Sequence, residues 1–171
     1  MDVEGAIYKR RSIRAYEGSP IDKEVLDSLL NAALEAPSAG NVQPYRIYVI
    51  TDLNMREELA RASLNQWFIA EAPINLVFTV NINEAYSAYG ERGVSLYSIL
   101  DVGAAIENLM LLATSYGLGT CWIGAFDEEE VSKLLNLPSN ERPISIVTLG
   151  YPRIERKRPK KKTIREVVVW R

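Results

Sequence analysis

The most restrictive feature of this sequence is a long segment, residues 100–116, whose side chains are apolar on almost every side. A helix of this kind is unfavourable on a protein surface because it would leave hydrophobic side chains in water, so we expect a central helix enclosed by other elements. Gly117 is the expected residue after its C-terminus. A chain of 171 residues is long enough to build one core around such a helix. We therefore expect a single domain over residues 1–171.

Helices and strands alternate along the rest of the chain, which predicts an α+β protein with helices packed on one mixed sheet. Asp2, Asp22 and Asp127 stand where side chains cap helices, and Pro37 should end the second helix. Residues 10–16 are expected to be extended. The expected helices cover residues 3–9, 23–36, 55–65, 100–116 and 127–137, and the expected strands cover residues 45–50, 74–80, 120–125 and 144–149.

Two absences narrow the possible chemistry. The chain has no histidine and one cysteine, Cys121. These counts exclude an intrachain disulfide, a cysteine-rich zinc site, Ser-His-Asp and Cys-His catalysis, and most transition-metal enzymes. We interpret Cys121 as a packing residue. An enzyme with so few acid–base groups needs a bound organic cofactor for difficult chemistry.

Charge and the N-terminal sequence bear on the compartment. The formal net charge is −2, which gives no reason to expect binding to nucleic acid or to an anionic membrane. The first residues lack the basic region of a signal peptide, and the longest apolar run, around residues 109–113, is too short to span a bilayer. These features predict a cytoplasmic protein without a membrane segment.

The first candidate site is the run Arg10-Arg11-Ser12-Ile13-Arg14. In an extended chain alternate side chains share a face, so Arg10, Ser12 and Arg14 should project together. Two guanidinium groups beside a hydroxyl suit a phosphate or a developing negative charge. The alternative is a solvated basic patch.

The second candidate lies between a helix and a strand, where small residues of the segment 36–45 would let a planar ligand approach the backbone. Ser38, Asn41 and Gln43 offer donors and acceptors for the edge of a heterocycle. An ordinary turn is the alternative. The third candidate, residues 117–126, follows a helix and enters a strand, which is the reverse of a dinucleotide fingerprint. Gly124 and Ala125 could leave a backbone N–H free for a ligand atom, or could simply form a tight bend.

The C-terminal region combines a basic run, residues 156–162, with an apolar end, residues 166–170. The basic run is open to three interpretations: a solvated tail, a phosphate clamp or a nucleic-acid contact. The apolar end is strand-like and should not hang free. It could form an edge strand on its own sheet, or reach across to the sheet of a partner subunit.

Taken in order, these segments resemble the nitroreductase family of FMN enzymes over nearly the whole chain. The resemblance implies an α+β sandwich, with a central mixed, mostly antiparallel sheet flanked by helices. It also implies an intertwined homodimer that binds FMN at the subunit interface, with the tail from about residue 153 exchanged between subunits. The segments that carry it are residues 10–14, 37–44, 72–73, the helix from Asp101, 117–124 and 149–152.

The resemblance assigns cofactor-binding roles by position and leaves no catalytic residue, because the flavin does the chemistry. Gly124 would present its backbone N–H to flavin N5, with Trp122 and Ala125 beside it. The phosphate, ribityl chain and pyrimidine edge would contact Arg10, Ser12 and Arg14, and a further phosphate contact would come from Arg11. Pro37, Ser38, Ala39 and Asn41 would line the ring from the other subunit with Gln43 in support, Asn65 or Gln66 would meet the pyrimidine side, and Lys160 and Lys161 stand where an arginine commonly grips the phosphate.

The implied activity is transfer of a hydride from NADH or NADPH, through flavin N5, to a small electron-poor acceptor such as a nitroaromatic, a quinone or an activated alkene. This chemistry needs no protein nucleophile and no histidine. The alternatives are a reductive dehalogenase or a flavin-cleaving enzyme of the same fold, or a flavin-binding module without turnover. Acceptor selection would rest on residues 81–97, a mobile excursion whose lid candidates are Glu84, Tyr86, Tyr89, Glu91 and Arg92, with a plain exposed loop as the alternative.

Overall fold

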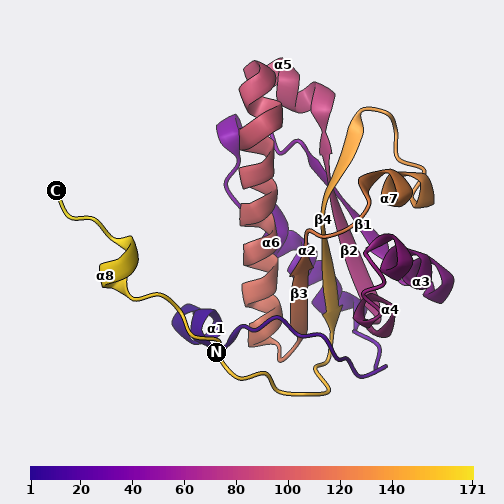
Figure 1. Ribbon diagram of the computed structural model, residues 1–171, viewed down its shortest axis with the longest axis vertical. Helices are drawn as coiled ribbons and strands as arrows, with labels where there is room; N and C mark the ends of the chain where they lie inside the picture. Colours follow the sequence, from indigo (N-terminus) through magenta and orange to yellow (C-terminus); the bar gives the residue numbers. More distant parts are fainter.

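A four-stranded sheet forms the middle layer of the protein (Figure 1). A computed structural model describes all 171 residues. The strands pair antiparallel in the order β1-β2-β4-β3, and the parallel pairing is limited to a single bridge between Ser12 and Thr120. The strands are β1 (Tyr45–Ile50), β2 (Ile74–Asn81), β3 (Gly119–Ile123) and β4 (Glu141–Gly150).

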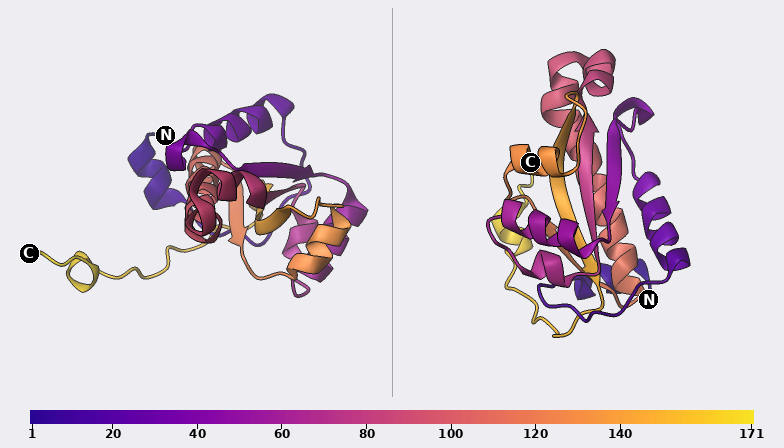
Figure 2. Two further views of the ribbon diagram at one scale, coloured as in Figure 1. Left: turned by 90° about the horizontal axis from the view of Figure 1, so that it is seen from above. Right: turned by 90° about the vertical axis from the view of Figure 1, so that its right-hand side faces the viewer.

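Helices cover both faces of this sheet, as the right-hand view of Figure 2 shows. One face carries α2 (Lys23–Leu34) and α6 (Ser98–Ser115), and the other carries α3 (Leu53–Ala62), α4 (Phe68–Glu71) and α7 (Glu128–Leu134). Side chains alternate between the faces, so Leu76 and Phe78 of β2 pack with the first set of helices while Val77 packs with the second. All eight residues of β2 are buried, as expected for a central strand covered on both sides. The predicted α+β class is confirmed.

The central helix expected from the sequence is α6. Nine of its residues are buried, and it packs against α2, α1 (Val3–Lys9) and the sheet. Gly117 follows it with a φ of +78°, the left-handed conformation that glycine adopts most easily. The N-terminal end of α6 stays open in a single chain, because Leu100 is 60% exposed and Ile99 is 37% exposed. The chain therefore does not enclose this apolar helix completely.

The helical stretch Ile82–Ser115 is long and apolar enough, by length and composition, to cross a membrane. The stretch also contains charged and polar residues, so the longest uninterrupted apolar run is still the short one around residues 109–113. The stretch is broken at Gly90, where φ is +57° and ψ is −147°, and its second half packs in the core. Core helices of globular proteins meet the same criterion, so we attribute its apolar composition to packing.

Residues 81–97 are the main departure from the expected elements. They form α5 (Ile82–Arg92) and a π-helical turn over Gly93–Tyr97, not an irregular excursion. The Asn81 side chain caps α5 by accepting a hydrogen bond from the N–H of Glu84, and Ala85 is buried. Of the glycines and tyrosines that suggested a loop, Tyr89 and Gly90 form the kink, Tyr86 lies within α5, and Gly93 and Tyr97 belong to the π-helical turn. Smaller differences are boundary shifts: α2 ends at Leu34, α3 covers Leu53–Ala62, α7 ends at Leu134, β3 begins at Gly119 and β4 begins at Glu141.

The C-terminal tail leaves the body of the protein (Figure 1). Its last part is one helical turn, α8 (Ile164–Val167), capped reciprocally by Thr163 and Glu166, followed by an extended end. The interpretation of this end as an edge strand on its own sheet is wrong, because it pairs with no strand. Trp170 is 86% exposed, so the apolar end finds no cover within its own chain.

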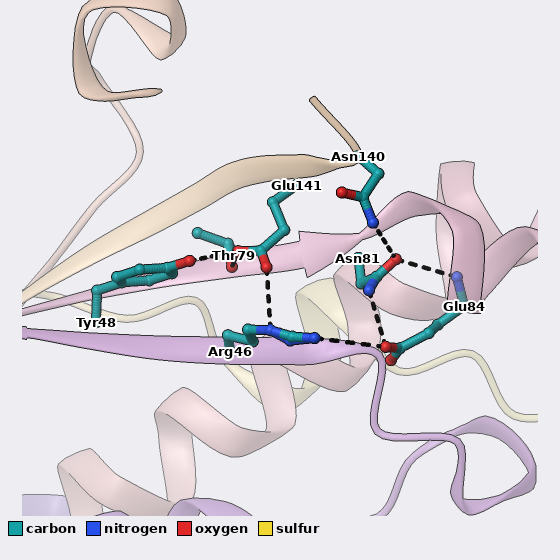
Figure 3. A network of polar contacts seen from close by, with 7 residues as sticks. All are labelled: Arg46, Tyr48, Thr79, Asn81, Glu84, Asn140 and Glu141. Carbon is teal, nitrogen blue, oxygen red and sulfur yellow. Dashed lines mark hydrogen bonds and ion pairs between the residues drawn. The ribbon is translucent and has the colours of Figure 1, made fainter. Parts of the chain in front are cut away.

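A buried polar network joins β1, β2, β4 and the start of α5 (Figure 3). Its centre is the Glu141 carboxylate, which accepts hydrogen bonds from the hydroxyls of Tyr48 at 2.7 Å and Thr79 at 3.0 Å. The Arg46 guanidinium lies 3.0 Å from the same carboxylate and 3.6 Å from that of Glu84. A carboxylate with a side chain only 3% exposed is stable here because all three partners compensate for its lost hydration.

Candidate functional site: a cationic hollow beside the edge of the sheet

A hollow of about 510 Å³ opens between α1, the middle of α6 and the beginning of the tail. Its size is within the range of small-molecule sites in proteins. Seven basic side chains line it and face one carboxylate, that of Glu107. The basic residues are Arg10, Arg11, Arg14, Arg156, Lys157, Arg158 and Lys161.

The segment 10–16 is held against the outer edge of β3. The N–H of Ile13 donates to the carbonyl of Thr120 at 2.8 Å, and the Tyr16 hydroxyl donates to the carbonyl of Ile13 at 2.8 Å. Gly119 allows this close approach, since a Cβ at that position would lie 2.7 Å from the Ile13 side chain. The backbone of Ser12 pairs with Thr120, which places its neighbours Arg11 and Ile13 at the edge of the sheet.

Each arginine of this segment has a different environment. Arg10 lies 3.4 Å from Glu107, an ion pair that orients its guanidinium across α6. Arg11 donates to the carbonyls of Tyr8 and Arg10 at 2.7 Å, while its buried Nε has no partner. Arg14 lies over the Phe68 ring at 5.8 Å from its centroid. Arg10, Ser12 and Arg14 line one hollow, but Arg11 lines it too, so alternation in an extended chain does not by itself account for the arrangement.

The one thiol of the chain, Cys121 on β3, lies next to Thr120 at this edge of the sheet and is 1% exposed. Burial raises the pKa of the Cys121 thiol, and the positive charges of Arg14 and Arg10 only partly oppose that effect. A thiol with a raised pKa is protonated at neutral pH and is a poor nucleophile. These features agree with the interpretation of Cys121 as a packing residue.

A second group of predicted residues lies where β3 ends. The Gln66 side chain donates to the carbonyl of Ala125 at 3.0 Å, which ties the turn after α3 to the backbone beyond β3. Asn65 precedes it in the left-handed conformation, with a φ of +59°. No atom lies within 4 Å of the position that a Cβ of Gly124 would take, so its backbone is open to a ligand. The Trp122 indole N–H donates to the Ser145 hydroxyl at 2.6 Å and leaves the ring 41% exposed.

The loop after α2 lies apart from the hollow and has an unusual backbone. It includes a 3₁₀ turn over Ala39–Asn41, and Gly40, Asn41 and Gln43 have φ values of 55°, 56° and 51°. The Ser38 hydroxyl accepts from the N–H of Gln43 at 3.2 Å. A backbone that departs this far from ordinary geometry persists only where its surroundings hold it, and such positions concentrate at functional sites.

Asp101 and Tyr89 hold this loop in place; neither was predicted as a flavin contact, and Tyr89 was predicted only as a lid candidate. The Asp101 carboxylate, on the first turn of α6, accepts a hydrogen bond from the N–H of Ala39 at 3.0 Å. Burial raises the pKa of Asp101, and this hydrogen bond partly opposes the rise. The Tyr89 hydroxyl packs so closely on Gly40 that a Cβ there would overlap it. The sequence signal that could have indicated Asp101 is a lone carboxylate in the first turn of an apolar helix.

Within one chain, the predicted site residues therefore fall into three groups. The hollow brings together Arg10, Arg11, Ser12, Arg14 and Lys161, whereas Lys160 does not line it. Sequence reasoning did not anticipate Tyr8 and Glu107 in its wall. The other two groups are Asn65, Gln66, Trp122, Gly124 and Ala125 around the end of β3, and Pro37, Ser38, Ala39, Asn41 and Gln43 in the loop after α2.

The lining of the hollow fits the phosphate end of the flavin nucleotide that the sequence resemblance implies. Phosphate oxygens accept several charge-assisted hydrogen bonds, and guanidinium groups suit them geometrically. The excess of cations around the hollow supplies such donors. The buried Nε of Arg11 and the buried hydroxyl of Thr120 lack hydrogen-bond partners, so donor capacity is left over at this edge of the sheet.

Known proteins share both the sequence pattern and the fold. The sequence model of the Nitroreductase family matches residues 7–79 and 64–151. A protein of Thermus thermophilus named NADH dehydrogenase is 31% identical over 198 aligned positions, which cover 100% of this chain and 97% of the relative. An Archaeoglobus fulgidus protein named putative NADH dehydrogenase/NAD(P)H nitroreductase is 34% identical over 154 positions, with 88% and 85% covered.

Among solved structures, the NADPH:FMN oxidoreductase of Vibrio harveyi, solved in complex with NAD+, superposes with a TM-score of 0.91. It is 28% identical, and the match covers 98% of this chain and 76% of that one. The matched segments of the family model contain the arginine-rich segment, the loop after α2 and the end of β3. The chain belongs to the nitroreductase family.

Proposed function

We propose that this chain is an FMN-dependent oxidoreductase that takes electrons from NADH or NADPH and passes them to a small electron-poor acceptor, such as a nitroaromatic, a quinone or an activated alkene. The observation that carries the proposal is the hollow in which seven basic side chains surround one carboxylate. The names of the relatives, which include nitroreductases and flavin oxidoreductases, support the same chemistry.

The flavin site in this proposal needs two copies of the chain. The hollow supplies Arg10, Ser12, Arg14 and Lys161 for the phosphate and ribityl chain, but few apolar side chains for a flat ring. The loop with Pro37 lies apart from the hollow of its own chain and is rigidly held. A second copy would therefore contribute this loop. The exposed side chains of Ile99 and Leu100 on α6 support such an association, because a partner would bury them.

The tail provides a second argument for a dimer. The end of the chain carries exposed Ile164, Val167 and Trp170, which is unfavourable in water. Residues 10–14 lie along the outer edge of β3, whereas β1 has no strand neighbour on its outer side. The exchanged tail from about residue 153 would first line the hollow of its own chain with residues of the segment 156–161, and its apolar end would then reach the partner and cover such an edge. We expect this homodimer to work in the cytoplasm.

When bound, FMN supplies the hydride exchange that no side chain of this protein can perform. The protein holds its phosphate with the arginines of the segment 10–14 and places positive charge near the ring. Such a charge favours an anionic form of a bound ligand over a neutral one. The open backbone at Gly124 offers an N–H as a hydrogen-bond donor, and Gln66 fixes the peptide next to it. Trp122 presents a half-exposed ring that excludes water from one side of the site.

Acceptor selection is a finer part of the proposal. The kinked helix α5 and the π-helical turn lie next to the loop after α2, with the ring edge of Tyr97 against Tyr89 at 5.3 Å and Arg92 donating to the Tyr97 hydroxyl at 3.0 Å. These residues would form the acceptor side of the partner's flavin site. A dehalogenating or flavin-cleaving enzyme of the same fold, or a flavin-binding module without turnover, would use the same hollow and is separated by the acceptor test below.

The test is the visible spectrum of the purified protein after addition of FMN and removal of excess flavin. The proposal predicts a retained yellow chromophore, anaerobic bleaching by NADH or NADPH, and recolouring by a nitroaromatic or a quinone. Retained flavin that neither nicotinamide bleaches would contradict the oxidoreductase and favour a binding module. A protein that retains no flavin would refute the site itself.

A further inference from the structure

The cationic hollow carries more positive charge than a flavin phosphate can balance. A phosphate monoester contributes about two negative charges at neutral pH. With that phosphate and the Glu107 carboxylate in place, about four of the seven cations around the hollow would still lack a counter-charge. Of the seven, Arg10 alone forms an ion pair within the chain. Mutual repulsion in a concave site is costly, so a second anion would stabilise it.

The surplus lies mainly in the segment 156–158, which enters the hollow from the side of α1. The Arg158 guanidinium lies 5.1 Å from the centre of the Tyr8 ring, and Tyr8 is 53% exposed. An aromatic ring next to a guanidinium plane is a platform on which a purine can stack. Arg156 and Lys157, the two preceding residues, have no acidic partner within 4 Å.

Arg156 also faces a neighbouring hollow of about 390 Å³, which shares Arg11 with the first one. Arg11 has a buried Nε with no hydrogen-bond partner. Arg11 and Arg156 therefore extend the positively charged surface from the first hollow, to which the flavin phosphate is assigned, into the second. A ligand that carries a purine close to a phosphate would match the platform and these free cations together.

We propose that Tyr8, Arg156, Lys157 and Arg158 form a second nucleotide subsite that binds the adenosine 2′-phosphate of NADPH, and that the chain therefore prefers NADPH to NADH. NADPH differs from NADH only in this phosphate, which sits on the ribose that bears the adenine. The inference rests on the proposed function, because it names the donor of the same flavin site. Family membership does not decide the point, since the names of the relatives include both nicotinamides.

A nucleic acid would also present phosphates and bases to a basic surface. The arrangement here favours a single nucleotide, such as the adenosine part of NADPH, over a nucleic-acid strand. It offers one stacking platform beside a hollow, not a row of aromatic side chains along a continuous basic groove. RNA binding is therefore an outcome that the experiment must separate.

The direct test is calorimetric titration of the FMN-loaded protein with adenosine 2′,5′-bisphosphate and with adenosine 5′-monophosphate, which lacks the 2′-phosphate. We expect the bisphosphate to bind at least roughly tenfold more tightly, the scale of one or two charge-assisted hydrogen bonds. Arg156→Gln should remove most of this difference. Arg153→Gln is the matched control, because Arg153 lies outside the hollow and pairs with Glu71 at 3.0 Å. It should retain the difference.

A kinetic readout completes the test. The ratio of kcat/KM for NADPH to that for NADH should exceed one in the wild type and should fall by roughly tenfold in Arg156→Gln but not in Arg153→Gln. Equal affinity for the two adenosine nucleotides, or equal behaviour of the two variants, would overturn the subsite. Tighter binding of a single-stranded RNA, competing with the bisphosphate, would overturn it in favour of a nucleic-acid contact. A protein that binds the bisphosphate selectively but is bleached by neither nicotinamide would contradict the proposed function and leave the subsite standing.

Discussion

The Glu141 network allows a quantitative test of how the fold is held together. In Glu141→Ala, the Thr79 hydroxyl loses its acceptor in a fully buried position, and the Tyr48 hydroxyl loses a 2.7 Å hydrogen bond. Arg46 is 47% exposed and lies 3.6 Å from Glu84, so it can turn to water or to that carboxylate. The variant loses two hydrogen bonds to a charged acceptor, and the buried Thr79 hydroxyl is left without a hydrogen-bond partner. Together these losses should lower the unfolding free energy by about 3–5 kcal/mol.

Two further variants make this prediction specific. Glu141→Gln keeps the size and one acceptor oxygen, so it should cost about 1–2 kcal/mol. The control is Glu128→Ala, which removes an ion pair with Arg142 at 2.7 Å in which both side chains are about half exposed. It should cost about 1 kcal/mol or less, the usual range for a surface ion pair.

The assay is urea denaturation of the flavin-free protein at one protein concentration, with the midpoint and the slope fitted separately. The account requires the order Glu141→Ala, then Glu141→Gln, then Glu128→Ala, with unchanged slopes. If Glu141→Ala and Glu128→Ala cost the same, the buried carboxylate does not stabilise the sheet in the way described.

Three further predictions concern the site and the dimer. Arg14→Ala should weaken FMN binding by about 1–3 kcal/mol in a fluorescence titration, and unchanged affinity would remove Arg14 from the phosphate site. Burial raises the pKa of the Asp101 carboxyl in the folded protein above its value in the unfolded chain. The folded state is therefore most stable, with respect to this group, below the unfolded pKa, and it loses that stability as pH rises through the folded pKa. Asp101→Asn should flatten that part of the stability profile in thermal melts, and an unaltered profile would contradict this cause. Truncation after Ile164 should weaken the dimer in light scattering, and a truncated chain that stays fully dimeric would argue against the exchanged tail.

Much of the fold was predictable because local patterns and tertiary packing agree. The strand over residues 45–50 was predicted with its observed bounds, and the apolar segment 100–116 does form the central helix. Residues 81–97 were misjudged because the signal for α5 is tertiary. Its cap comes from the last residue of β2, and its kink at Gly90 places glycine and tyrosine inside a helix. From composition alone, a segment with these residues is predicted to be a loop.

The site was predictable in part for a similar reason. The grouping of Arg10, Ser12 and Arg14 could be expected from their alternation in an extended chain, which is a local property, whereas Arg11 joins them in the hollow against that pattern. The contact of Asp101 with Ala39 spans 62 residues of sequence, so periodicity gave no indication of it. Residues 156–158 lie beside α1 because β4 ends near the start of the chain. This is a property of the whole fold, so local patterns in the sequence do not predict it. Within one chain, the loop after α2 and the hollow do not meet, which is why the proposed site requires a second copy.

The central claim is that flavin binds where two copies of the chain meet, and sedimentation velocity tests it most directly. The FMN-loaded protein would be followed at once by its protein absorbance and by the visible absorption band of the flavin. The account predicts that the flavin sediments only with a dimer, and that dilution to monomer releases it. Flavin that sediments with the monomer, or a stable dimer that carries none, would contradict the account.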